Sequence, residues 1–543
     1  MKVPSLLLVV AAATCSFGAA IQAREESFSE QLLDTLGSFS SSDPIVSELS
    51  AAIRNSSAVL DQAPNQNNAI SARASTFQAQ VACQLLRCIL PDSYTDARTN
   101  QTDYVTLRDK NWSSNCDLPA ACFITPEHPV QVAIALQVIS RVQSKFAVRS
   151  GGHNPNPGFA GIGQEGVMID TQRFSQLSLS ADKSYATIGA GLRFGPVQEY
   201  LDSQGVAVVS GRNKYVGVSG LLLGGGHPII NSLTGLAADN IKSMEVVLSD
   251  FRVVTASRTE NSDLFRALKG GGNNFGIVTK FDLYTKMPRN LWYRNAIYAA
   301  SDAKAVLKAL AEVQKNMEQD PKAGIQMTCS PAGFTVAFVY GEPTNDPAVF
   351  APFSKLVPTS ERTPPTNGTT LEFIELQSPP QPDASRDTVG VTTTLDADMY
   401  LDFYNRYLDI NAANNGTSAA FLLVIQTLGA AAARVADCNG GNVLGTSKRA
   451  LTLWNPISTW TDPADDNRVH NVLTQIGNYI KDQSQAKNLY DPFIFANIAA
   501  HDQKVLASYG SQNLNFLRGV SQKYDRNGTF QRLQNGGFLV SKS

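Results

Sequence analysis

The 543-residue sequence predicts an α+β fold in two parts, and two observations support this prediction. Between residues 145 and 281, short apolar segments of strand length alternate with helical segments and glycine-rich turns, which is typical of a compact α/β unit. After about residue 290, apolar and polar residues alternate along longer strand candidates, with helical segments between them. The second pattern predicts an antiparallel sheet with helices on one face.

The composition fits a large folded protein with a small-molecule partner. The chain is 43% apolar and 17% charged, so it can bury a large core, and its length suggests two or three domains. Lys and Arg total 45 against 47 for Asp and Glu, and this balance argues against nucleic acid as the main partner. There is no C-x-x-C pair or H-E-x-x-H run, so the sequence predicts no metal site.

The first twenty residues have the features of a secretory signal peptide. A lysine at position 2 is followed by an apolar stretch over 5–13 and by small residues at 18–20. The apolar stretch is too short to span a membrane securely, so we expect no membrane partner. A buried N-terminal helix is the alternative interpretation. We therefore expect a leader over 1–20 and a secreted or secretory-pathway protein.

Sequons for N-glycosylation fit the same compartment, because six of them occur along the chain. The asparagines concerned are Asn55, Asn100, Asn111, Asn367, Asn415 and Asn527.

Cysteine usage is also compatible with secretion. Removal of the leader would remove Cys15 and leave six cysteines, an even number that permits disulfides in an oxidising compartment. Four of the six cluster ahead of the α/β unit, namely Cys83, Cys88, Cys116 and Cys122. Cys329 and Cys438 pair or stay free, and the sequence leaves the connectivity open.

The elements of the first part follow in chain order. Residues 21–75, rich in Ser, Ala, Asn and Asp, predict a helical or loosely ordered lead-in, and the prolines at 126 and 129 open a helix. Apolar runs predict strands at 145–149, 166–170, 185–189, 206–210, 244–248, 253–254 and 277–281, with a helix over 194–203.

The second part has a different texture. Alternation predicts strands at 334–340, 371–376 and 420–426, and helical periodicity predicts helices over 302–317 and 470–486. The proline-rich segments 358–365 and 379–382 predict loops, and 508–530 predicts a polar helical segment.

Three glycine clusters are the most informative local features. They lie at 151–152, 217–226 and 270–276, each next to an apolar segment, so they do not resemble linkers. Glycines after a buried strand let the backbone turn tightly and aim N–H groups at an anion, of which phosphate is the usual one. Three clusters within about 130 residues therefore suggest backbone packed close to an extended ligand.

Two other patterns fail as motifs. The glycines at 189, 191 and 195 resemble a dinucleotide fingerprint, but one residue too many precedes the last glycine, and no acidic residue follows at the expected distance. Ser219 lacks the second glycine of a nucleophile elbow, since Leu221 stands there, so a serine hydrolase is not indicated.

Several motifs in order resemble the fungal FAD-linked oxidoreductases of the berberine-bridge-enzyme-like group, within the vanillyl-alcohol-oxidase superfamily. The segments that carry the resemblance are 149–153, 211–226, 235–240, 261–278, 509–513 and 523–525. The resemblance covers the chain from about Cys116 to the C-terminus.

The resemblance implies a two-lobed PCMH-type FAD-binding domain and a substrate domain whose antiparallel sheet covers the flavin. The expected division is a signal peptide over 1–20, a lead-in over 21–115, an FAD-binding domain over 116–290, a substrate domain over 291–495 and a C-terminal segment over 496–543 that returns to the FAD-binding domain.

The resemblance also implies roles for individual residues. His153 matches the histidine that is joined covalently to the flavin 8α-methyl carbon. The pyrophosphate would be held by Ser150, Gly151, Gly152 and Asn154. Gly217, Ser219, Gly220 and Gly225 would lie along the cofactor. Gly276, Ile277 and Val278 would reach its adenine half, and Asn497 and Asn513 match C-terminal positions facing the flavin region.

Two departures from the family pattern bear on the chemistry. Bicovalent members carry a cysteine where this chain has Asn213, so we expect a single covalent link, through His153. Plant members often place a glutamate base near the position of Gln426, and sugar-oxidising members have a tyrosine near Ile498, so both familiar bases are absent here. His227 is a candidate polar group near the flavin, with a structural histidine as the alternative, and Asn497 is a candidate for orienting substrate.

The implied reaction is transfer of hydride from a substrate carbon to N5 of FAD, with loss of a proton and reoxidation by molecular oxygen. We expect dehydrogenation or oxidative cyclisation of a small organic molecule in fungal secondary metabolism. A secreted carbohydrate or alcohol oxidase and a non-redox cyclase that uses the flavin as a scaffold are the alternatives. The sequence leaves the oligomeric state open.

Overall fold

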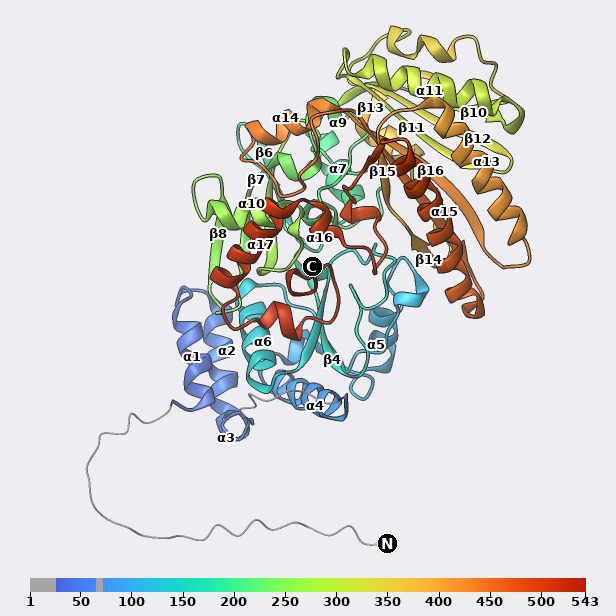
Figure 1. The fold of residues 1–543 in the computed structure, drawn as a ribbon. Coiled ribbons are helices and arrows are strands. Elements are labelled where there is room, and N and C mark those ends of the chain that lie inside the picture. Colours follow the sequence, from blue (N-terminus) through green and yellow to red (C-terminus); the bar gives the residue numbers. More distant parts are fainter. Residues whose placement is uncertain (1–25, 65–71) are drawn as a thin grey trace, which may run out of the picture.

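Three β-sheets organise the computed structural model, which describes residues 26–64 and 72–543 (Figure 1). Helices pack around all three, so the α+β class expected from the sequence is confirmed. The expected leader and its Cys15 lie outside the described residues. No helix within those described ranges is both long enough and apolar enough to cross a membrane.

The lead-in forms helices α1 (Phe28–Gly37), α2 (Pro44–Asn55), α3 (Ser57–Leu60) and α4 (Ala72–Ile89). Ser27 caps α1 in a capping box with Glu30, and Asp43 accepts a hydrogen bond from the backbone of Ile45 at the start of α2. Their apolar faces join the main core, where Leu32 and Ile53 are fully buried. The first helices therefore fold onto the body of the protein.

The first sheet has four strands in the order β1-β2-β4-β3, which are β1 (Tyr94–Thr95), β2 (Cys122–Ile124), β4 (Gly166–Asp170) and β3 (Lys145–Arg149). β2, β4 and β3 run parallel, and every residue of β4 is buried, which explains its continuous apolar run. Helix α6 (Pro129–Val142) is buried almost all round, and helix α5 (Gln101–Arg108) precedes β2 in the chain.

The second sheet has five antiparallel strands in the order β5-β6-β9-β7-β8. They are β5 (Leu177–Leu179), β6 (Tyr185–Gly189), β9 (Ile277–Tyr284), β7 (Ile241–Val247) and β8 (Val253–Ser257), with helices α7 (Phe194–Ser203), α8 (Val218–Leu223), α9 (Asn231–Thr234) and α10 (Ser262–Gly271) around them. The strand expected at 206–210 does not form. Val208 is buried, but its carbonyl accepts from the side chain of Gln198 rather than from a neighbouring strand.

The third sheet has nine strands, with its longest path in the order β13-β10-β12-β11-β16-β17-β15-β18 and β14 paired to β17. The strands are β10 (Asn290–Ala299), β11 (Ala323–Ser330), β12 (Gly333–Tyr340), β13 (Ser360–Thr369), β14 (Ser385–Thr388), β15 (Val391–Thr393), β16 (Ala420–Leu428), β17 (Leu451–Trp460) and β18 (Tyr490–Asp491). Helices α11 (Ala303–Met317), α13 (Ala397–Ala413) and α15 (Asp466–Ala486) lie side by side over one face and enclose a second core (Figure 1). Helix α14 (Ala430–Cys438) follows β16 in the chain.

Two expectations about this part of the chain are wrong. The proline-rich segment 358–365 is not only loop, because 360–369 forms β13 at the edge of the sheet, with a register irregularity around Pro364 and Pro365. An edge position and a bulge are where a sheet tolerates prolines. Residues 371–376 form helix α12 (Thr370–Leu376) instead of a strand, with Thr369 and Glu372 in a capping box.

The chain end returns to the first two sheets. Helix α16 (Val505–Ser508) leads into α17 (Ser511–Tyr524), which packs against α10. Farther on, Gln534 forms a parallel bridge with Phe146 of β3, and the N–H of Asn535 donates to the Phe146 carbonyl at 2.8 Å. The C-terminal segment therefore packs on elements of the first two sheets.

Among the described residues, Cys83 and Cys122 form a disulfide that ties α4 to β2. Cys88, Cys116, Cys329 and Cys438 are free, so the connectivity that the sequence left open comes down to one bridge. Five of the six sequon asparagines are exposed, but the side-chain nitrogen of Asn111 donates to Asp117 (2.9 Å) and to the Cys116 carbonyl (3.0 Å). The nitrogen that would carry a glycan is therefore engaged inside the fold at Asn111.

Candidate functional site

The three glycine clusters meet at one cavity of about 400 Å³. Its walls come from the loop after β3, from the segments around α8 and at the start of β9, from the third sheet and from the C-terminal segment. The expected site residues that line it are Ser150, Gly151, Gly152, His153, Asn154, Gly217, Ser219, Gly220, His227, Ile277, Val278 and Asn497.

Two of the glycine clusters touch backbone to backbone. A methyl group on Gly151 would lie 2.5 Å from the Cα of Gly217, and one on Gly217 would lie 2.5 Å from the nitrogen of Gly151. Only glycine permits this approach, which brings the loop after β3 against the segment that leads into α8.

The loop after β3 presents unused backbone donors to the cavity. Gly152 adopts φ +67°, and the backbone N–H groups of residues 151–154 have no acceptor among the described residues. Successive N–H groups in such a turn form a nest for an anion. The hydroxyls of Ser150 and Ser219 both donate to the Ala190 carbonyl (2.6 and 2.7 Å), so the loop would hold a pyrophosphate mainly through its backbone.

His153 projects from this loop and stacks on Trp112, with ring centroids 4.1 Å apart and planes at 11°. The guanidinium of Arg386 lies over the Trp112 ring, with its Cζ 5.0 Å from the ring centroid. Burial, with a smaller contribution from the cations Arg193 and Arg386, lowers the pKa of His153 to about 3, so its imidazole is neutral at pH 7. Nε2 is enclosed and has no hydrogen-bond partner among the described residues.

Three expected cofactor residues do not line the cavity. A methyl group on Gly225 would meet the ring of Phe495, and one on Gly276 would meet Val246, so both positions pack against protein. Asn513 accepts from Arg266 (2.7 Å) and donates to the Tyr509 carbonyl (3.0 Å). All three therefore contact other parts of the protein and not the cavity.

His227 lines the cavity but has no free nitrogen. Nδ1 lies 3.2 Å from Nη1 of Arg212, and Nε2 lies 2.9 Å from the Thr427 carbonyl. A guanidinium only donates and a carbonyl only accepts, so Nδ1 accepts and Nε2–H donates. Burial, together with Arg212, lowers the pKa of His227 to about 3. The one lone pair of His227 therefore accepts from Arg212 and positions it, and it is not available to take a proton from a substrate.

Both ends of the Asn497 side-chain amide are likewise engaged in hydrogen bonds. Its Oδ1 accepts from the N–H of Gly226 (2.9 Å) and its Nδ2 donates to the Gly220 carbonyl (3.0 Å). A methyl group on Gly224 would lie 2.3 Å from Nδ2. Asn497 thus clamps the C-terminal segment onto the second glycine cluster.

The lining residues that can ionise are few. Among the described residues that line the cavity, His153, His227 and Arg212 carry ionisable side chains, and none is Asp, Glu, Tyr, Lys or Cys. Two lining residues, Arg212 and Trp112, were not predicted as site residues from the sequence, because neither belongs to a recognisable spacing pattern. The nearest sequence signal for Arg212 was its position between Gly211 and Asn213, inside a segment that carries the family resemblance.

Residues 120–257 match the model of an FAD binding domain. An FAD-dependent monooxygenase of Arthrobotrys oligospora is 38% identical over 465 residues, which cover 84% of this chain and 90% of the relative. The bifunctional solanapyrone synthase of Alternaria solani is 30% identical over 445 residues, which cover 80% of this chain and 85% of that protein.

Among solved structures, the glucooligosaccharide oxidase of Acremonium strictum is similar with a TM-score of 0.69 and 18% identity, over 82% of this chain and 97% of that one. The description of that structure names a 6-S-cysteinyl, 8α-N1-histidyl FAD. At this identity the likeness shows the fold, which is that of the berberine-bridge-enzyme-like oxidases.

Proposed function

Since the chain belongs to the family of FAD-dependent oxidoreductases that includes these fungal monooxygenases, we propose that it dehydrogenates or oxidatively cyclises a small molecule of secondary metabolism, with FAD joined covalently to His153. The observation that carries this proposal is the position of His153, held by Trp112 beside the free N–H groups of residues 151–154 at the wall of the glycine-lined cavity.

The surroundings of His153 fit an imidazole substituted on one nitrogen. A neutral ring that is substituted on one nitrogen has no N–H left, and its other nitrogen carries a lone pair. The enclosed Nε2 of His153 has no partner among the described residues, and in such a ring this nitrogen has no N–H that needs an acceptor. Asn213 has no thiol, so one covalent link is proposed and not two.

When bound, FAD supplies the two-electron redox chemistry, and the protein supplies orientation and control of protons. Over one turnover the substrate loses two hydrogens, and dioxygen accepts both and becomes hydrogen peroxide. Since the described lining has no carboxylate or phenol, the proton leaves a substrate group that is itself acidic. Gln426 on the cavity wall accepts from Arg212 at 2.9 Å, and its amide is not a base.

We also propose that the protein enters the secretory pathway. The Cys83–Cys122 bridge supports this, because structural disulfides persist in oxidising compartments. The leader-like start of the chain and the five exposed sequons point the same way.

The test of the function begins with a comparison of metabolites in the source organism with and without the gene. The compound that accumulates is then added to the purified protein, and oxygen uptake and peroxide are measured. We expect peroxide in equal amount to product. Peroxide from a panel of sugars and simple alcohols, with none from the accumulated compound, would favour the carbohydrate oxidase. Product formed without oxygen, with unchanged flavin absorbance, would favour the non-redox cyclase.

A further inference from the structure

Arg212 is a cation in the cavity wall without an anionic partner. Its Nη1 donates to Gln426 Oε1 (2.9 Å) and to His227 Nδ1 (3.2 Å), whereas Nε and Nη2 have no hydrogen-bond partner among the described residues. None of the ion pairs formed within 26–64 and 72–543 includes Arg212. Burial lowers its pKa to about 10, so it remains charged at neutral pH.

A half-buried guanidinium without a carboxylate is costly unless a ligand supplies the charge. Its neighbours are arranged to keep the cation in place, since both are uncharged and both accept from the same nitrogen. Resting on the proposed function, we infer that Arg212 binds an anionic oxygen of the substrate, such as a carboxylate, an enolate or a phenolate.

This assignment also accounts for the absence of a carboxylate or phenol among the described residues that line the cavity. A phenol or enol placed against Arg212 loses its proton more readily, because the adjacent cation stabilises the oxyanion. The two unpartnered nitrogen groups of Arg212 match the fork geometry with which a guanidinium holds a carboxylate. Neutral sugars lack such an anion, so the same residue disfavours them as substrates.

Equilibrium binding without turnover tests the assignment. The probe is benzoate, with benzamide as its neutral isostere, and binding to the flavin-loaded protein is followed by calorimetry and by the flavin difference spectrum. We expect benzoate to bind more tightly than benzamide. Arg212→Met should weaken benzoate about tenfold or more and leave benzamide unchanged, and Arg212→Lys should restore part of the affinity.

Benzoate that binds no more tightly than benzamide to the wild type, or equally well to Arg212→Met, would overturn the assignment. A shift of the flavin reduction potential in Arg212→Met with unchanged benzoate affinity would overturn it too, because the cation would then serve the cofactor. These results do not depend on peroxide formation, so failure of the oxidase proposal is separable.

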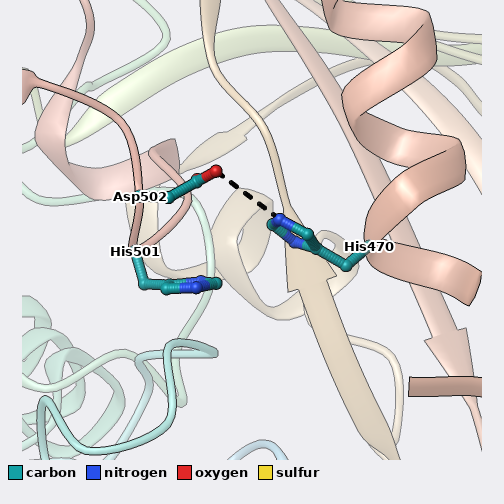
Figure 2. A group of neighbouring side chains, drawn as sticks. All are labelled: His470, His501 and Asp502. Carbon is teal, nitrogen blue, oxygen red and sulfur yellow. Dashed lines mark ion pairs between the residues drawn. The ribbon is translucent and has the colours of Figure 1, made fainter. Parts of the chain in front are cut away.

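A second cluster lies outside the cavity and involves different residues. His470 of α15 faces His501 and Asp502 of the C-terminal segment, and one ligand atom from each lies within 4.8 Å of the others (Figure 2). Nε2 of His470 lies 3.7 Å from Asp502 Oδ2, and the two imidazole centroids are 5.1 Å apart.

Asp387, at β14, supplies the feature that distinguishes this cluster from an incidental ion pair. Its Oδ2 lies 2.7 Å from Nδ1 of His470, which turns Nε2 of that ring toward His501 and Asp502. Histidine ligands of metals commonly donate their other nitrogen to a carboxylate in this way. Two imidazoles and one carboxylate are a ligand set for zinc and related ions.

We propose that His470, His501 and Asp502 bind a divalent ion of the zinc class, with water in the remaining positions. Such an ion would tie α15 to the segment 496–502, which carries Asn497 on the cavity wall. No recognisable metal-binding motif marks this site, because His470 and His501 are thirty-one positions apart.

Zinc titration of tag-free, chelator-treated protein tests this proposal by calorimetry. We expect one equivalent to bind and the melting temperature to rise. His501→Ala should weaken binding at least tenfold, and Asp387→Asn about tenfold, because the orienting carboxylate is lost. The matched control is His128→Ala, since His128 also pairs with an aspartate, Asp43, on the surface.

An unchanged zinc affinity in His501→Ala would overturn the proposal, as would a wild type that binds no zinc. Equal weakening by His128→Ala would do so as well, because it would show nonspecific binding to surface histidines.

Discussion

The imidazole of His153 lies parallel to the indole of Trp112, with 4.1 Å between the ring centroids and 11° between the planes. Trp112 comes from the lead-in and His153 from the loop after β3, so the stack joins two separate segments at the cavity wall. Stacking of this kind fixes the orientation of the histidine ring before any ligand arrives.

Loss of the stack should therefore impair attachment of the flavin. We expect Trp112→Ala to lower the fraction of covalently bound FAD and Trp112→Phe to retain most of it, because an aromatic pair contributes about 0.5–1.5 kcal/mol beyond its buried area. Flavin fluorescence in a denaturing gel measures the covalent fraction. Equal covalent fractions in Trp112→Ala and wild type would contradict a positioning role for Trp112.

His227 should make the fold sensitive to acid. Its pKa is about 3 in the fold and near 6.5 in the unfolded chain, so below pH 6.5 protons bind the unfolded state first. The stability contributed by the neutral ring is thus complete above pH 6.5 and is lost as the pH falls toward 3.

In His227→Gln, the free energy of unfolding should fall less steeply between pH 6 and pH 4, by up to about 1.4 kcal/mol per pH unit. Denaturant melts at several pH values measure this slope. A slope identical to that of the wild type would mean that His227 is not held neutral.

Gly220 offers a test of where the cofactor lies. A methyl group there meets no protein atom within 4 Å, yet the residue lines the cavity. We expect Gly220→Ala to fold with an unchanged melting temperature in the cofactor-free protein and to bind FAD at least tenfold more weakly, because the methyl group takes up ligand space.

The control for this variant is Gly519→Ala on the exposed side of α17, where the methyl group also meets nothing. It should bind FAD as the wild type does. Full flavin content in Gly220→Ala would place the cofactor elsewhere in the cavity.

The Cys83–Cys122 bridge should contribute to global stability. It closes a loop across 39 positions, and the chain entropy removed by a bridge of this span corresponds to about 4 kcal/mol. We expect the Cys83→Ser/Cys122→Ser double variant to lose stability of this order in denaturant melts. Cys88→Ser, at an exposed free cysteine on the same helix, should melt with the wild type. A double variant as stable as Cys88→Ser would contradict this account.

Local patterns predicted much of the fold. The apolar run at 166–170 is a fully buried parallel strand, and the helix over 194–203 has the expected bounds. The patterns failed where the same spacing of apolar residues is compatible with both a strand and a helix. Leu371, Phe373 and Ile374 fit a strand or a helix, and the capping box from Thr369 to Glu372 was the overlooked signal that favours the helix.

The site was less accessible to sequence reasoning than the fold. The glycines at 151 and 217 indicated close backbone approach, but the contact between them depends on tertiary packing. Arg212, Gln426 and His227 come from separate segments, so their hydrogen bonds could not be read from spacing. For the same reason the sequence left His227 open between a polar group near the flavin and a structural histidine, and the hydrogen bonds of both ring nitrogens favour the structural histidine.

The most direct test of the account is the location of the flavin on the purified native protein. After acid precipitation and proteolysis, mass spectrometry should find FAD attached to the peptide that contains His153. His153→Ala should retain its fold, as judged by circular dichroism, and release its flavin on precipitation. Complete release of flavin from the wild type, or attachment at another residue, would contradict the central claim.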